Sequence, residues 1–178
     1  EIFRSMGSGT DTALLQTIIV GIINLSFTIL AIFTVDHWGR KPLQIAGAFG
    51  MAFFMIVLGF TFFLEQVNLV SLICMLGYVA CFALSWGPVT WVLLSEIFPN
   101  RIRGRAMALA VAAMWISNLI ISLTFPILNN SSALNQVLHH GFTYWIYGIM
   151  GILAALFVRK YVPETKGRSL EEIEHHWK

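Results

Sequence analysis

The sequence predicts an all-α integral membrane protein with five membrane-spanning helices and a short helix in its polar C-terminal tail. Of its 178 residues, 57% are hydrophobic and only 11% are charged, whereas an ordinary soluble domain is about 25% charged. The charges are clumped between long apolar runs, although the outside of a soluble protein needs them along every element. A bilayer is therefore the expected solvent, and helices with internal backbone hydrogen bonds are the spanning structure possible at this length.

Four charge-free stretches are each long enough to cross the hydrocarbon core, which takes about 20 apolar residues: residues 12–35, 42–64, 66–95 and 106–158. The fourth is too long for a single crossing. Its middle holds residues that favour a loop: Pro126, Asn129, Asn130, Ser131, Ser132, Asn135, His139 and His140. We therefore expect an outside segment at 1–11, spans at about 12–35, 42–64, 68–95, 105–127 and 141–162, and a polar tail at 163–178.

The first span is followed by the polar segment "DHWGRKP" at 36–42. Gly39 permits a tight turn, and Pro42 suits the start of the next helix. Asp36 and Arg40 bracket the turn at a spacing that lets them pair with each other or with charges on a neighbouring helix. The alternative is a basic loop that only sets the orientation of the chain.

The third span ends in a second polar segment, "SEIFPNRIRGRA" at 95–106. Glu96 lies where the third span leaves the membrane, and Arg103 lies where the fourth begins. This placement suits an ion pair that fastens the two helix ends together. The alternative is that Glu96 only terminates its helix and the arginines contact lipid phosphates.

The fifth span is followed by the tail "YVPETKGRSLEEIEHHWK". Pro163 ends the span, and Gly167 permits a turn. Ser169 and Glu172 have the spacing of a capping box for a short helix that runs towards Trp177. That helix is too polar to span a membrane, so we expect it to lie across the cytoplasmic face.

The basic residues predict the orientation, because Lys and Arg in short loops stay on the cytoplasmic side. Two, three and five of the 11 basic residues follow the first, third and fifth span, and only Arg4 lies opposite. The tail is therefore expected in the cytoplasm and the start of the chain outside. Basic residues beside long apolar runs favour a membrane surface over nucleic acid as their partner.

The chain is expected to be a fragment of a longer protein. It opens on Glu1 with no basic stretch before its first apolar run, so it shows neither a signal peptide nor a translation start. Five helices would also leave one flank of a bundle without a partner. Small residues in "GAFG" and "GIMG" recur at helical spacing and let helices approach closely within lipid.

The three polar segments together resemble motifs of the sugar porter family of the major facilitator superfamily. "DHWGRKP" is similar to D-x-x-G-R-[KR], "EIFPNRIRGRA" to E-x-x-P-x-x-x-R-G, and "VPETKGRSLEEIE" to P-E-T-K-G-x-[ST]-L-E-E-[IL]. The stretches "LLQTIIVGIINL", "SWGPVTWVLLSEIFPN" and "GFTYWIYG" resemble the bacterial proton-coupled xylose symporters of that family. The resemblance implies the C-terminal half of a twelve-helix transporter, with the five spans as helices eight to twelve.

The resemblance also implies a function, namely transport of a monosaccharide such as xylose or a related pentose or hexose across a bacterial inner membrane. Transport would occur by alternating access coupled to proton import. Ion pairs of Asp36, Arg40, Glu96 and Arg103 would close the cytoplasmic side. The apolar part of each span lacks Asp, Glu, His, Lys and Arg, so the proton site is expected in the missing N-terminal half. The alternative is an uncoupled sugar facilitator.

A central sugar site is implied at five positions that match the family: Asn24, Phe82, Gly87, Trp91 and Trp115. A sugar offers hydroxyls for hydrogen bonds to an amide and C–H faces that stack on aromatic rings. An amide deep in an apolar span needs a partner. For Asn24, the alternative is a hydrogen bond to a neighbouring helix.

One position departs from the family pattern. Just before Trp115, where the similar symporters carry a side-chain amide, this chain has Met114. Methionine cannot replace an amide as donor and acceptor for a sugar hydroxyl. Either the substrate differs from xylose, or the site is weakened, or the chain is a diverged or engineered variant.

The segment "WGPVTW" at 86–91 is expected to interrupt its helix. Pro88 cannot donate a backbone hydrogen bond, and Gly87 relaxes the backbone. Such a kink would serve as a hinge for gating, or it would be one of the kinks that occur in helices that do not move.

The sequence disfavours two other classes of function. A non-transporting sugar sensor usually carries a long cytoplasmic extension, and this tail ends shortly after Trp177. A membrane enzyme would need paired carboxylates, a histidine cluster or an activated nucleophile inside the spans. His139 and His140 are expected to face solvent, and Cys74 and Cys81 to be reduced core residues. We therefore expect no cofactor and no bound metal.

Overall fold

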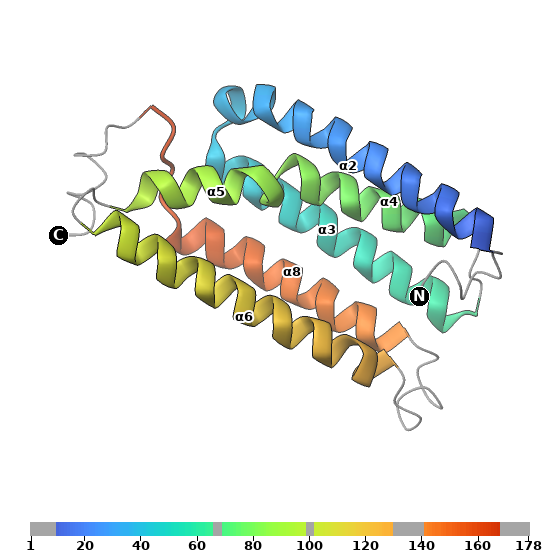
Figure 1. Ribbon diagram of the computed structural model, residues 1–178. Coiled ribbons are helices and arrows are strands. Elements are labelled where there is room, and N and C mark those ends of the chain that lie inside the picture. Colours follow the sequence, from blue (N-terminus) through green and yellow to red (C-terminus); the bar gives the residue numbers. More distant parts are fainter. Residues whose placement is uncertain (1–9, 66–68, 99–101, 130–140, 168–178) are drawn as a thin grey trace.

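The computed structural model describes residues 10–65, 69–98, 102–129 and 141–167, and every regular element in these ranges is an α-helix (Figure 1). The helices are α2 (Thr10–Trp38), α3 (Arg40–Phe63), α4 (Leu69–Leu84), α5 (Trp86–Ile97), α6 (Arg103–Asn129) and α8 (Gly141–Tyr161). Because α4 and α5 run nearly end to end, the helices make five membrane-length apolar spans. The predicted all-α membrane fold with five spans is confirmed. The predicted tail helix and the pair His139 and His140 lie outside the described residues.

Helix α3 is the centre of the bundle and packs most extensively against α8 and α4 (Figure 1). Small residues permit this close approach. A Cβ added at Gly59 would lie 2.4 Å from Cδ1 of Trp145, and one at Gly148 would lie 2.7 Å from Cγ1 of Ile56. Backbones that approach this closely gain dispersion contacts, which hold helices together in lipid where no hydrophobic drive exists between them.

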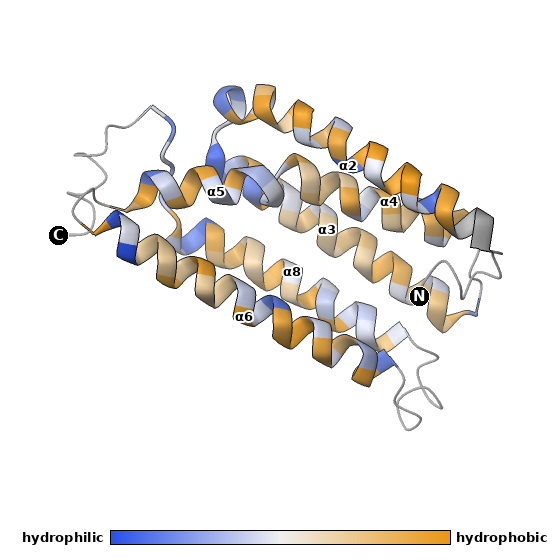
Figure 2. Cartoon of the chain, in the orientation of Figure 1, coloured by the Kyte–Doolittle hydropathy of each residue, from blue (hydrophilic) through white to orange (hydrophobic). Residues whose placement is uncertain are grey.

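The outer faces of α2 and α6 are apolar and uncovered (Figure 2). No residue of α6 is buried, and among the described side chains of α2 only Ala31 is buried. In water, apolar surface of this extent would aggregate, whereas in a bilayer or against another protein segment it is stable. Hydrophilic residues gather mainly at the helix ends (Figure 2), as expected for helices that cross a membrane.

The third span is interrupted at Ser85, one residue before the segment that the sequence predicts to be irregular. Pro88 lies in the first turn of α5, where a missing N–H costs no helical hydrogen bond. The regular ladder resumes with the N–H of Val89, which donates to the carbonyl of Ser85 at 3.0 Å. The Ser85 hydroxyl donates to the carbonyl of Cys81 at 2.7 Å, so the polar side chain at the break is hydrogen-bonded to the preceding turn of α4.

Ser85 packs directly against α3 at Gly47. A Cβ built on Gly47 would lie 1.7 Å from Oγ of Ser85 and 2.4 Å from its Cβ. Both residues are buried. The break in the third span is therefore seated in a notch of α3 that only glycine leaves open.

Replacing Gly47 by alanine is expected to destabilise the bundle, because Ser85 is held by Cys81 and cannot withdraw. We expect a loss of about 1–3 kcal/mol, the usual cost of overpacking, measured as a lower Tm of the purified full-length protein in detergent. The matched control is Gly21→Ala in α2, where an added Cβ meets nothing within 4 Å. Equal Tm values for the two variants would contradict the notch.

Candidate functional site

A charge cluster lies at the end of the bundle where α2 and α5 end and α3 begins (Figure 1). At its centre, Arg40 donates from Nε to Oε2 of Glu96 at 3.2 Å and from Nη2 to Oε1 at 2.9 Å. Its Nη1 lies 3.1 Å from Oδ1 of Asp36. The Arg40 side chain is only 14% exposed, whereas that of Asp36 is 73% exposed. The two-pronged bond to Glu96 is therefore the stronger contact, because it is better shielded from water.

Glu164, which follows α8, completes the charge cluster by capping α3. Its carboxylate accepts from the backbone N–H of Arg40 at 3.0 Å and from that of Lys41 at 3.1 Å. These donors have no partner within the helix, and a negative charge there also favours the helix dipole. The capping residue Gly39 has φ +92°, and a Cβ there would lie 2.9 Å from Oε2 of Glu164. Glycine is therefore required both by the backbone and by the approaching carboxylate.

Thr165 links the same segment to α5. Its hydroxyl donates to Oε2 of Glu96 at 2.6 Å, and the residue is only 4% exposed. The ammonium of Lys166 donates to the carbonyl of His37 at the end of α2. The charge cluster therefore joins four segments: the end of α2, the start of α3, the end of α5 and the segment after α8.

Glu96 pairs with Arg40 in the structure, and not with Arg103 as the sequence predicts. Arg40 and Thr165 together occupy both oxygens of the Glu96 carboxylate. Nε of Arg103 instead donates to the carbonyl of Phe98 at 3.5 Å, and its Nη2 is buried without a partner among the described residues. The predicted pair of Asp36 with Arg40 is present.

Glu164 and Thr165 are functional candidates to which the sequence analysis assigned no role. The signal was present, because a carboxylate and a hydroxyl follow the last span within the tail motif and near basic residues. The sequence could not show that Glu164 contacts Arg40, because the two residues are 124 positions apart in the chain.

The five predicted sugar-binding residues lie on four helices: Asn24 on α2, Phe82 on α4, Gly87 and Trp91 on α5, and Trp115 on α6. Phe82, Trp91 and Trp115 are 42%, 46% and 62% exposed. Asn24 is also exposed. Met114, beside Trp115, is half-buried.

The structure does not gather these residues around one cavity. Asn24 accepts a hydrogen bond from Thr28 on its own helix at 3.4 Å, and within the part of the chain that the structure describes it makes no bond to a neighbouring helix. Trp91 and Trp115 expose large indole faces at the surface of the bundle. A molecule that stacks on Trp91 or Trp115 would therefore lie against the outside of this chain.

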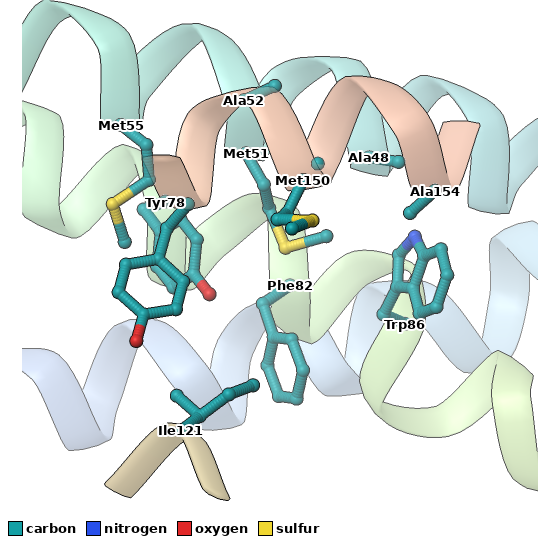
Figure 3. A pocket seen from close by; sticks show the side chains of 12 residues that line it. Ala48, Met51, Ala52, Met55, Tyr78, Phe82, Trp86, Ile121, Met150 and Ala154 are labelled. Atoms are coloured by element: carbon teal, nitrogen blue, oxygen red, sulfur yellow. The ribbon is translucent and has the colours of Figure 1, made fainter. Parts of the chain in front are cut away.

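A separate, partly open pocket of about 300 Å³ lies between the helices, where Phe82 is the one predicted sugar residue among its lining residues (Figure 3). Figure 3 shows Met51, Met150 and Trp86 beside it. Its walls are mostly apolar, and the polar groups of its lining are the hydroxyls of Tyr78 and Tyr147 and the indole N–H of Trp86. The Tyr147 hydroxyl lies 3.3 Å from Oγ1 of Thr124, and the Trp86 N–H already donates to the carbonyl of Gln44 at 2.9 Å. A sugar needs several donors and acceptors around it, so this cavity does not suit a sugar.

Comparisons with known proteins agree with this architecture. A family model described as "Sugar (and other) transporter" matches residues 1–177. The chain is 62% identical over 177 residues to the D-xylose-proton symporter of Escherichia coli (strain K12), covering 99% of this chain and 36% of that protein. It is 48% identical over 178 residues to the glucose facilitated diffusion protein of Zymomonas mobilis, covering 100% of this chain and 38% of that protein.

Solved structures give the same result. A structure of the proton:xylose symporter bound to 6-bromo-6-deoxy-D-glucose matches with a TM-score of 0.90 at 61% identity, covering 99% of this chain and 37% of that one. An inward open conformation of the xylose transporter from E. coli matches with a TM-score of 0.85 at 60% identity, covering 94% and 37%. The chain thus spans little more than a third of the proteins that it matches.

Replacing Glu164 by glutamine is expected to loosen the start of α3, because the amide removes the charge and one of the two acceptor oxygens. Hydrogen exchange of the backbone amides of Arg40 and Lys41 should become roughly tenfold faster, the effect of losing a charge-assisted cap. The control is Asp36→Asn, since Asp36 belongs to the charge cluster but does not contact these amides. Unchanged exchange in Glu164→Gln would contradict the cap.

Proposed function

We propose a transport function for this chain from one premise: the chain belongs to the sugar transporter family. Because it spans 36% to 38% of the length of its relatives, the activity belongs to a longer protein in which this chain forms the C-terminal half. That protein carries a monosaccharide, xylose or a related pentose or hexose, across a bacterial inner membrane by alternating access. The tail after α8 lies on the cytoplasmic side.

The observation that carries this proposal is the charge cluster. It ties the end of α5 to the start of α3 and to the segment after α8 through Arg40, Glu96 and Glu164. A transporter needs one end of each half to behave as a unit that meets or leaves the other half. Asp36, Arg40, Glu96 and Arg103 supply this half's share of the cytoplasmic gate.

The sugar site lies between the two halves. Asn24, Phe82, Gly87, Trp91 and Trp115 contribute from this side. Trp91 and Trp115 support this placement, because a large exposed indole can stack on the C–H face of a sugar when the other half covers it. The cavity within this bundle is too apolar for a sugar, which favours a site between the halves over one inside this half.

Transport is coupled to proton import, and the coupling group lies in the other half. Two relatives are named as proton symporters, for D-xylose and for arabinose. The apolar parts of the five spans contain no Asp, Glu, His, Lys or Arg, so no titratable carboxylate or imidazole of this half lies at mid-membrane. The alternative is an uncoupled facilitator, which one specific observation favours: a relative at 48% identity is named a glucose facilitated diffusion protein.

Uptake of labelled pentoses and hexoses by the full-length protein in proteoliposomes tests the function. We expect saturable uptake of one sugar, concentrated by an inward proton gradient and reduced about fivefold by Trp91→Ala, because one aromatic stacking contact contributes about 1 kcal/mol. Saturable uptake without concentration would indicate the facilitator. Absence of uptake for every sugar would refute the proposal.

Met114 is expected to set the choice of sugar. Replacing it by glutamine restores a side-chain amide that can donate to and accept from a hydroxyl. We expect Met114→Gln to lower the KM for xylose relative to glucose by about tenfold, since a designed hydroxyl contact changes discrimination strongly. Met114→Leu, which keeps the volume without polarity, is the control. Equal sugar preferences for these two variants would show that residue 114 does not contact the sugar.

A further inference from the structure

Gln44 is a buried amide on the second turn of α3, one turn after Arg40. It is only 2% exposed, although it lies in an apolar span, where a buried amide without partners costs free energy. Neither the family motifs nor the charge cluster includes it. Its contacts therefore need an explanation of their own.

Among the described residues, the tertiary hydrogen-bond partners of Gln44 lie on α5. Its Nε2 donates to Oγ1 of Thr90 at 3.3 Å, and its backbone carbonyl accepts from Nε1 of Trp86 at 2.9 Å. The Thr90 hydroxyl donates its single hydrogen to the carbonyl of Trp86 at 2.6 Å. Its oxygen can therefore only accept from Gln44, which fixes the orientation of the amide.

This orientation leaves Oε1 of Gln44 buried without a partner among the described residues. A buried acceptor in that state is destabilising. Leucine or methionine would fill the same space without this cost. The amide is therefore better explained by the contact that Nε2 makes to α5 than by packing of α3 alone.

Three successive turns of α3 hold α5 in an antiparallel ladder. Arg40 holds Glu96, Gln44 holds Thr90, and the Gly47 notch receives Ser85. The outer two contacts fix the ends of α5. The middle contact fixes its rotation about its own axis, because Gln44 reaches two residues one turn apart, Trp86 and Thr90.

That rotation decides where Trp91 points. Trp91 follows Thr90, so it lies about 100° further round the helix, away from α3, and it is 46% exposed. We propose that Gln44 is a positioning residue for sugar recognition: its amide holds Thr90 so that the indole of Trp91 faces the sugar. This inference rests on the proposed transport function. It assigns to α3 an indirect role in sugar recognition, because the side chain of Gln44 acts through Thr90 on α5 and does not itself contact the sugar.

The test compares sugar uptake by full-length variants in proteoliposomes. Gln44→Met keeps the volume and removes both donors of the amide. Thr90→Val removes the partner hydroxyl, and Thr90→Ser keeps it. We expect Gln44→Met and Thr90→Val each to raise the KM about fivefold, the effect of one net hydrogen bond. Their double variant should raise it no further, because both substitutions remove the same bond. Thr90→Ser should restore the parental KM.

A background that lacks the indole separates positioning from general damage. In Trp91→Ala, adding Gln44→Met should leave the KM unchanged, because there is no ring left to position. An equal rise of KM in both backgrounds would overturn the inference, and so would a parental KM in Gln44→Met alone. If the parent shows no saturable uptake of any sugar, the proposed transport function itself fails, which is distinct from saturable uptake with an unaltered KM.

Discussion

The arrangement of one whole end of the bundle depends on the guanidinium of Arg40. A guanidinium is always charged and carries five donors in a rigid fork, and here it is only 14% exposed. It therefore requires fixed acceptors, and breaking a buried pair from one side leaves an uncompensated charge. Glu96 supplies two oxygens from α5, while Glu164 caps the N–H of the same residue. One side chain and its backbone thus hold three segments that are distant in sequence.

Polar side chains further along α3 and α5, within the apolar region, also require hydrogen-bond partners. Gln44 takes its partner from α5, and Ser85 takes its partner from its own helix while it fills the notch at Gly47. In lipid, an unpaired polar group has no water to bond to, so each of these contacts is costly to break. The interrupted third span is consequently held against α3 along α5, from the Ser85 break to Glu96.

This mechanical arrangement and the proposed sugar site meet at α5. The face of α5 that carries Thr90 is committed to α3, and the exposed indole of Trp91 follows on the next position. The pocket that Phe82 lines is mostly apolar, which is why the proposed recognition of a polar solute is placed on the exposed surface. Under the proposed function, this chain holds its contact residues in place with its own core, and the remainder of the longer protein encloses the solute.

The sequence alone determined the five spans, because hydropathy and length are local properties of each stretch. It also predicted an interruption of the third span at 86–91, one residue beyond the break at Ser85, and allowed the pair of Asp36 with Arg40, which are one turn apart. The tertiary structure alone decided that Arg40 pairs with Glu96, 56 positions away. It also decided that Arg103 bonds to the carbonyl of Phe98 instead of to Glu96, and that Glu164 caps α3. It also decided that Gln44 reaches Thr90. These contacts depend on which helix faces meet, and long, evenly apolar helices carry little information about that in their residue pattern.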